Sequence, residues 1–234
     1  MKCDTKMQIL LTNDDGYRAP GIHALRNALV DFGKPTILAP LIELSGCGHR
    51  VTTHQPLKLE LQEPDLYSLD GTPADCVRVG LHSAMKKVDW VFSGINSGGN
   101  LGVDVFISGT VAAVREGAIH GIPGIAFSQY RKKGLEVDWA LAARWAKMVA
   151  TRLLHEPISP GEFWNVNFPH LEQPVETPEL VYCKPNASPL PLAFKALDNQ
   201  FQYSGEYHSR HHVQGTDVET CFSGRIAISK MSVF

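Results

Sequence analysis

Two adjacent carboxylates, Asp14 and Asp15, stand in a tight Asn-Asp-Asp-Gly turn near the start of the chain. The apolar residues before them predict a short buried strand, and Pro20 begins an amphipathic helix with apolar side chains at Ile22, Leu25, Leu29 and Phe32. Two like charges held between a strand and a helix repel each other unless a cation shares them. The same four residues are also ordinary turn formers, so the local sequence supports a metal site and a plain turn about equally.

Two further loops rich in glycine and small polar residues follow predicted strands. One contains Ser45 and Gly46, and the other runs from Ser93 to Thr110. Loops that leave the carboxyl ends of parallel strands open onto the same edge of a sheet, where ligands bind. Two carboxylates, a serine hydroxyl and an asparagine carbonyl form an all-oxygen set, which suits Mg²⁺ or Mn²⁺ better than zinc or copper. This convergence favours the metal site over the plain turn.

The triplet Ser108-Gly109-Thr110 precedes a predicted helix and offers backbone N–H groups, two hydroxyl groups and the positive end of the helix dipole. By itself it is more typical of a simple helix cap, but opposite a divalent cation it becomes a phosphate site. The P-loop, Gly-x-Gly-x-x-Gly, Cys-x₅-Arg, Asp-x-Asp and Gly-x-Ser-x-Gly motifs are missing from the sequence. Metal-assisted attack of water on phosphorus is the remaining route.

The elements that position these loops alternate between strand and helix over the first 168 residues. Further strands are expected at 35–39, 88–92, 123–128 and 163–168, and helices after Thr72, after Ser108 and over 139–153. Alternation of this kind predicts an α/β fold with a Rossmann-like, doubly wound and mainly parallel sheet. An antiparallel pair is expected at 51–61 and 66–69, and the first helix is expected to end at Gly33.

The pattern changes after Phe168, where proline and glycine become frequent and only short β-like pieces remain, at 180–183, 201–203 and 225–233. We therefore expect residues 1–168 to form a Rossmann-like catalytic core. Residues 169–234 are expected to form a β-hairpin and oligomerisation extension of the same domain. Three nearby histidines could bind zinc, but no cysteine or carboxylate is spaced to complete that site, so a solvated loop is favoured for His208, His211 and His212.

Composition excludes several classes of protein. A chain of 234 residues with 44% hydrophobic content buries a sufficient core without disulfides, and its five cysteines are irregularly spaced, which fits a reducing cytoplasm. The net charge of −2 and the small basic clusters argue against a nucleic-acid polymer as partner. Apolar runs are too short for a signal-peptide core or a membrane span, so a cytoplasmic protein without membrane contact is expected.

Several motifs in order along the chain resemble the SurE (survival protein E) family of metal-dependent phosphatases, which act on nucleoside monophosphates. The resemblance is dense from about residue 8 to 128 and thinner afterwards. It is carried by Ile9–Gly16, Ala19–Ile22, Ser45-Gly46, Gly71–Val77, Ser93–Gly102, Ser108–Ala113, Asn165–Pro169 and Gly215–Ser229.

The resemblance implies that Asp14, Asp15, Ser45 and Asn96 bind one divalent cation per subunit, Mg or Mn. It also implies that Ser108, Gly109 and Thr110, with Asn100 on the preceding loop, bind the phosphate. A homodimer or homotetramer built partly by exchange of C-terminal segments is a further implication. The loop at 41–44 is more apolar than the usual polar version in this family, which bears on substrate preference.

We therefore expect a phosphomonoesterase that hydrolyses nucleoside 5′-monophosphates, and 3′ esters as a further class, with Asp14 and Asp15 as catalytic residues. A non-catalytic nucleotide-binding or regulatory module is the alternative, and a phosphate-ester transferase is a third reading. The sequence leaves open the preferred base, the ester position, the physiological metal, polyphosphate activity and which aspartate acts as general base. The roles of Cys47, His49 and Arg50, which lie beside the proposed site, are open as well.

Overall fold

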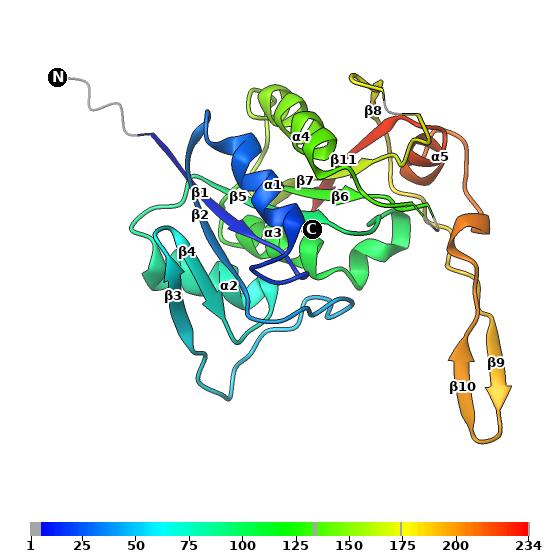
Figure 1. Ribbon diagram of the computed structural model, residues 1–234, viewed down its shortest axis with the longest axis horizontal. Helices are drawn as coiled ribbons and strands as arrows, with labels where there is room; N and C mark the ends of the chain where they lie inside the picture. Colours follow the sequence, from blue (N-terminus) through cyan, green and yellow to red (C-terminus); the bar gives the residue numbers. More distant parts are fainter. Residues whose placement is uncertain (1–5, 133–134, 174, 234) are drawn as a thin grey trace.

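A nine-stranded sheet forms the centre of the computed structural model, which describes residues 6–132, 135–173 and 175–233 (Figure 1). Its strand order is β3-β4-β2-β1-β5-β6-β7-β11-β8, and the run from β4 to β7 is parallel throughout. The strands are β1 (Met7–Thr12), β2 (Gly33–Pro40), β3 (Leu59–Glu63), β4 (Leu66–Leu69), β5 (Trp90–Asn96), β6 (Gly124–Gln129), β7 (Glu162–Phe168), β8 (Leu180–Tyr182) and β11 (Ile226–Ser232).

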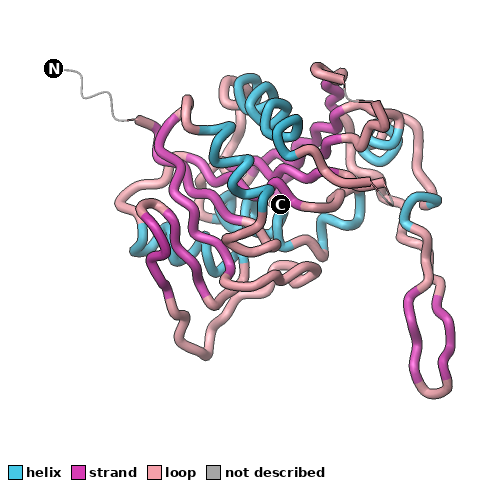
Figure 2. Tube along the Cα trace, viewed as in Figure 1, coloured by secondary structure: helices cyan, strands magenta, loops and turns pink. Residues whose placement is uncertain are grey.

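Helices lie on both sides of this sheet (Figure 2). One apolar cluster packs α1 (Pro20–Leu29) and α4 (Trp139–Leu153) on one face, and a second packs α2 (Pro73–Val79) and α3 (Gly109–Ile119) on the other. Local sequence sets where the helices begin. Thr72 and Asp75 form a capping box at the start of α2, and the Ser108 hydroxyl accepts the Val111 N–H at the start of α3. The predicted α/β architecture with a mainly parallel sheet is confirmed.

Two local predictions were wrong, and one short helix was missed. Helix α1 ends at Leu29, and Gly33 instead begins β2, where an added Cβ would lie 2.1 Å from the Met7 carbonyl oxygen. Glycine is therefore needed there for close strand pairing and not as a helix cap. The strand expected over 51–61 forms only at Leu59–Glu63, because the preceding residues line a cavity instead of pairing. The short helix α5 (Asp217–Phe222) was not predicted.

The C-terminal part contributes to the main sheet and also leaves it. Strand β11 pairs antiparallel with β7 and parallel with β8, which widens the sheet. Strands β9 (Phe194–Leu197) and β10 (Gln200–Tyr203) form a separate hairpin that extends away from the body (Figure 1). All eight of their residues are exposed, and Phe201 is 75% exposed.

The described part of the chain contains no helix with the length and apolar character needed to cross a membrane. Its four cysteines are free thiols, and Cys3 lies outside the described residues. The three C-terminal histidines are exposed, and no group of three His, Cys, Asp or Glu side chains within the described ranges could hold a metal ion.

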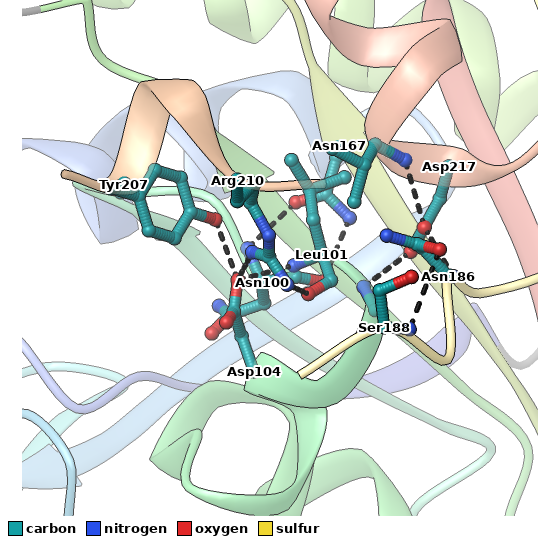
Figure 3. Close-up of polar contacts among 12 residues, drawn as sticks. Asn100, Leu101, Asp104, Asn167, Asn186, Ser188, Tyr207, Arg210 and Asp217 are labelled. Carbon is teal, nitrogen blue, oxygen red and sulfur yellow. Dashed lines mark hydrogen bonds and ion pairs between the residues drawn. The ribbon is translucent and has the colours of Figure 1, made fainter. Parts of the chain in front are cut away.

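A buried ion pair holds the C-terminal segment against the glycine-rich loop after β5 (Figure 3). The Arg210 guanidinium lies 2.8 Å from the Asp104 carboxylate and also donates to the Leu101 carbonyl at 3.3 Å. The Tyr207 hydroxyl donates to the same carboxylate at 2.5 Å, and burial beside Asp104 raises the pKa of Tyr207. Both charged side chains are almost fully buried, so each depends on the other for its charge compensation.

Replacing Arg210 by alanine should therefore lower the free energy of unfolding by about 3–5 kcal/mol, because Asp104 would remain as a buried charge without its partner. Urea denaturation followed by far-UV circular dichroism measures this loss. Lys132→Ala breaks the exposed pair with Glu172 and serves as the control, with no expected shift in the unfolding midpoint. Equal midpoints for the two variants would contradict a stabilising role for the buried pair.

Candidate active site

Three loops at one edge of the sheet bring the predicted ligands together. Asp14 and Asp15 follow β1, Ser45 lies in the loop after β2, and Asn96 ends β5. These strands are neighbours and parallel, so their carboxyl ends share one edge. The Leu44 N–H donates to the Asp14 carbonyl oxygen at 2.7 Å, which ties the loop after β2 to the turn after β1.

The start of α3 lies directly against Asp14. The Thr110 hydroxyl donates to the Asp14 carboxylate, and a Cβ added to Gly109 would lie 2.8 Å from Asp14 Cβ and 2.8 Å from Cys47 Sγ. Only glycine therefore allows the helix to approach this closely. The residues of the expected anion cradle therefore lie in contact with one of the two expected carboxylates.

The two carboxylates are both held in surroundings that disfavour their charge. Burial raises the pKa of Asp14, while the Thr110 hydroxyl and nearby backbone N–H groups lower it in part. The pKa of Asp15 is raised to about 6, mainly by burial and next by the Asp14 charge, while the Ser97 N–H, which donates to this carboxylate at 3.1 Å, lowers it in part. A cation bound by both carboxylates would stabilise their ionised forms and so lower both pKa values.

The remaining donors also fit a hard divalent cation. The Ser45 side chain is exposed and its hydroxyl donates to Glu43 at 2.8 Å, while its lone pairs remain able to bind a metal. The Asn96 amide nitrogen donates to the Gly98 carbonyl at 2.9 Å, so the amide oxygen is the atom that could bind a cation. The side-chain oxygen of Asn13 is buried without a hydrogen-bond partner in the described part of the chain. The turn is rich in oxygen acceptors, which Mg²⁺ and Mn²⁺ prefer.

Mn²⁺ should raise the melting temperature more at about pH 7.5 than at about pH 5. The folded-state pKa of Asp15 is raised from 3.8 to about 6, so this carboxyl supports the metal-free fold below pH 3.8 and that support is lost as the pH rises through 6. Above pH 6 the Asp15 carboxyl is ionised, and a bound cation would compensate its charge. Below pH 6 protons would compete with the cation for this carboxylate. Scanning fluorimetry with and without Mn²⁺ at both pH values measures the difference, and equal shifts would contradict it.

The predicted phosphate-binding residues differ in their surroundings. Ser108 caps α3 through its bond to Val111, and the first N–H groups of the helix, those of Gly109 and Thr110, face the Asp14 side. Asn100 is buried, and its side-chain amide donates to the Ser128 hydroxyl at 2.7 Å. Its backbone is held by Asn167, whose carboxamide accepts from the Asn100 N–H at 2.8 Å. Asn100 thus fixes the glycine-rich loop, and its contact with phosphate stays a prediction.

His49 lies beside the site but points to a buried carboxylate on α3. Its Nε2 atom lies 2.7 Å from Glu116, which also binds Arg78 and His120, each at 3.1 Å. These partners hold the pKa of Glu116 below its usual range despite its burial. Sequence reasoning missed this anchor because His49 and Glu116 are 67 positions apart and no local motif joins them.

Comparison with known proteins finds a family of similar sequence. The family model described as Survival protein SurE matches residues 9–187. A relative from Nostoc sp., provisionally named a 5′-nucleotidase, is 53% identical over 97% of this chain and 100% of its own length. The 5′-nucleotidase SurE of Aquifex aeolicus is 37% identical over 95% of this chain and 90% of its own.

The fold itself has been seen before in a crystal structure. That of the SurE protein from Aquifex aeolicus superimposes with a TM-score of 0.84 at 35% sequence identity, covering 97% of this chain and 94% of that one. The family model, the similar sequences and the crystal structure thus agree. The chain belongs to the survival protein SurE family.

Proposed function

We propose that this protein is a metal-dependent phosphomonoesterase that hydrolyses nucleoside 5′-monophosphates, and 3′ esters as a further class, to nucleoside and phosphate. The observation that supports the proposal is the contact between the Asp14 carboxylate and the first turn of α3, because it would place a bound cation next to a bound phosphate. Relatives that bear the name 5′-nucleotidase SurE, aligned over most of the chain, support the same activity.

In this proposal Asp14, Asp15, Ser45 and Asn96 would hold one Mg²⁺ or Mn²⁺ per subunit. Such a cation, when bound, lowers the pKa of water and offsets the negative charge of the phosphate. The positive end of the α3 dipole, at Gly109 and Thr110, lies beside Asp14 and attracts the phosphate. The Thr110 hydroxyl donates a hydrogen bond to the Asp14 carboxylate and so orients it.

Asp15 is the better placed of the two aspartates to take a proton from the attacking water. Asp14 is 4% exposed and is held by Thr110, whereas Asp15 is only partly buried and accepts from the Ser97 N–H. A general base must lie within hydrogen-bond reach of the proton that it takes, and the partial exposure of Asp15 lets water approach it. We assign Asp14 to binding and orientation, and Asp15 to binding and proton transfer.

The proposal includes a cytoplasmic location and a homodimer or homotetramer. The β9–β10 hairpin and its approach carry exposed apolar side chains, of which Leu192 is 92% and Phe194 56% exposed. Apolar surface on a projecting hairpin is typical of segments that pack against a second subunit. Sedimentation of the hairpin variant Phe194→Ser against the wild type measures this contribution to assembly.

Measuring AMP binding and phosphate release on the same protein distinguishes hydrolysis from binding without turnover. Incubation with AMP and Mn²⁺ should release phosphate continuously without any added acceptor. Saturable AMP binding with no phosphate released under any divalent metal would instead support the regulatory module. Product that forms only when an alcohol acceptor is supplied would support a transferase.

A further inference from the structure

A cavity of about 590 Å³ lies next to the Asp14–Asp15 turn, because Leu44, which lines the cavity, donates its N–H to the Asp14 carbonyl oxygen. It is lined by Leu41, Ile42 and Leu44 on one side, by residues 50–57 on another and by residues 69–72 at its base. We call it the 41–57 pocket. Its size lies within the range of about 300–1,000 Å³ that is typical of small-molecule sites.

The pocket and the candidate active site are built from one loop. Residues 41–44 and residues 50–57 form two walls of the pocket. The residues that connect these walls in the chain, 45–48, run through the candidate active site. At the start of that crossing the Leu44 N–H binds the Asp14 carbonyl oxygen, and at its end the Gly48 N–H donates to the Ile107 carbonyl at 2.9 Å. Ile107 directly precedes Ser108, so the loop that joins two walls of the pocket contacts the segment that leads into the proposed phosphate turn.

Hydrogen bonds hold the lining of the pocket in place. Asp75 accepts two hydrogen bonds from Thr52, through its N–H and its hydroxyl, both at 2.8 Å. The Thr72 hydroxyl donates to the Arg50 carbonyl at 2.6 Å and so fixes the second lining. A preformed wall of this kind binds a ligand at a lower entropic cost than a loop that must order on binding.

The lining combines apolar surface with unpaired polar groups. Ile42 is 64% exposed and Leu41 is 44% exposed, although both lie next to the charged turn. Within the described ranges no hydrogen bond occupies the side chains of Thr53, His54 or Gln55. Apolar walls for a flat ring and free donors and acceptors for its polar edge are what a heteroaromatic base requires.

We propose that the 41–57 pocket binds the base of the nucleoside monophosphate whose phosphate is held at Ser108–Thr110. This inference rests on the proposed function and adds the determinant of its selectivity. Leu41 and Ile42 contact the faces of the base, and the 53–55 segment binds its polar edge. The apolar character of the 41–44 loop then has a role in substrate binding.

The test compares AMP with ribose 5-phosphate, which carries the same phosphoester but no base. Two variants alter the pocket in opposite ways: Ile42→Ser removes apolar surface and Thr53→Trp fills the cavity. In each, the ratio of kcat/KM for AMP to that for ribose 5-phosphate should fall five- to tenfold, mainly through KM for AMP. Ile119→Ser changes a similarly exposed residue at the end of α3 and is the matched control, with an unchanged ratio.

Ratios in both pocket variants that equal the wild-type ratio would overturn the proposal. If the wild type releases phosphate from neither compound, the proposed function fails, but the pocket is still tested by calorimetric binding of AMP with Mn²⁺. Weaker AMP binding in Ile42→Ser and Thr53→Trp than in Ile119→Ser would then support the base pocket. Unchanged AMP binding in both would overturn it.

Discussion

Replacing Asp14 by asparagine should lower kcat/KM for AMP about 1,000-fold, because a ligand of the cation contributes on the order of 4 kcal/mol to the stabilisation of developing charge. The same substitution should raise the melting temperature of the metal-free protein. Burial raises the pKa of Asp14, which means that the ionised carboxylate lowers the stability of the folded protein unless a cation is bound. Asparagine keeps an oxygen acceptor for the Thr110 hydroxyl and removes the charge.

These opposite effects separate lost chemistry from lost structure. Phosphate release and scanning fluorimetry without metal are measured on the same preparation. Asp65→Asn is the matched control, since it lies before β4 at the opposite edge of the sheet and asparagine tolerates its positive φ of 59°. An Asp14→Asn protein that remains folded and hydrolyses AMP at the wild-type rate would show that Asp14 is not part of the catalytic site.

Replacing Gly109 by alanine should lower kcat/KM for AMP by about 100-fold, comparable to the loss of one backbone donor in an oxyanion site. The added Cβ would lie 2.8 Å from both Asp14 Cβ and Cys47 Sγ, so the helix start, the carboxylate or both must move. Crowding in a packed site costs about 1–3 kcal/mol of stability as well. Steady-state kinetics and urea denaturation measure the two effects.

Gly98→Ala is the control for this substitution, because its Cβ would meet only the Asn96 side-chain nitrogen, at an ordinary 3.5 Å, and would not contact the amide oxygen proposed to bind the cation. Its activity should stay within a few-fold of the wild type. Adding Cys47→Ala to Gly109→Ala removes one of the two short contacts and should restore part of the lost activity. Equal activity of Gly109→Ala and Gly98→Ala would contradict the close approach of α3 to Asp14.

Much of the site could be predicted because its parts follow short-range and topological rules. The turn after β1 places two carboxylates next to each other in sequence, and Ser108 is a cap that any helix of this type can use. The neighbouring parallel order of β2, β1 and β5 then brings their loops to one edge. None of these steps requires knowledge of side-chain packing.

What could not be predicted depends on contacts between distant segments. Arg210 and Asp104 are 106 positions apart, and nothing in the local sequence of either shows that both are buried. Gly33 resembles a helix cap in sequence, yet its role is set by the Met7 carbonyl on a different strand. The 41–57 pocket lies where a strand was expected. Thr52 and Arg50 form their hydrogen bonds with Asp75 and Thr72 and not with a neighbouring strand.

Phosphate release from AMP, followed while Mn²⁺ is titrated into metal-stripped protein, tests the central claim most directly. The account predicts no release with EDTA, and release that rises in proportion to bound Mn²⁺ and saturates at one ion per chain. In Asp14→Asn both the bound Mn²⁺ and the release should be lost. Full phosphate release in EDTA, or release that is independent of Mn²⁺ occupancy, would contradict the proposal that the Asp14–Asp15 turn is the metal-binding part of the active site.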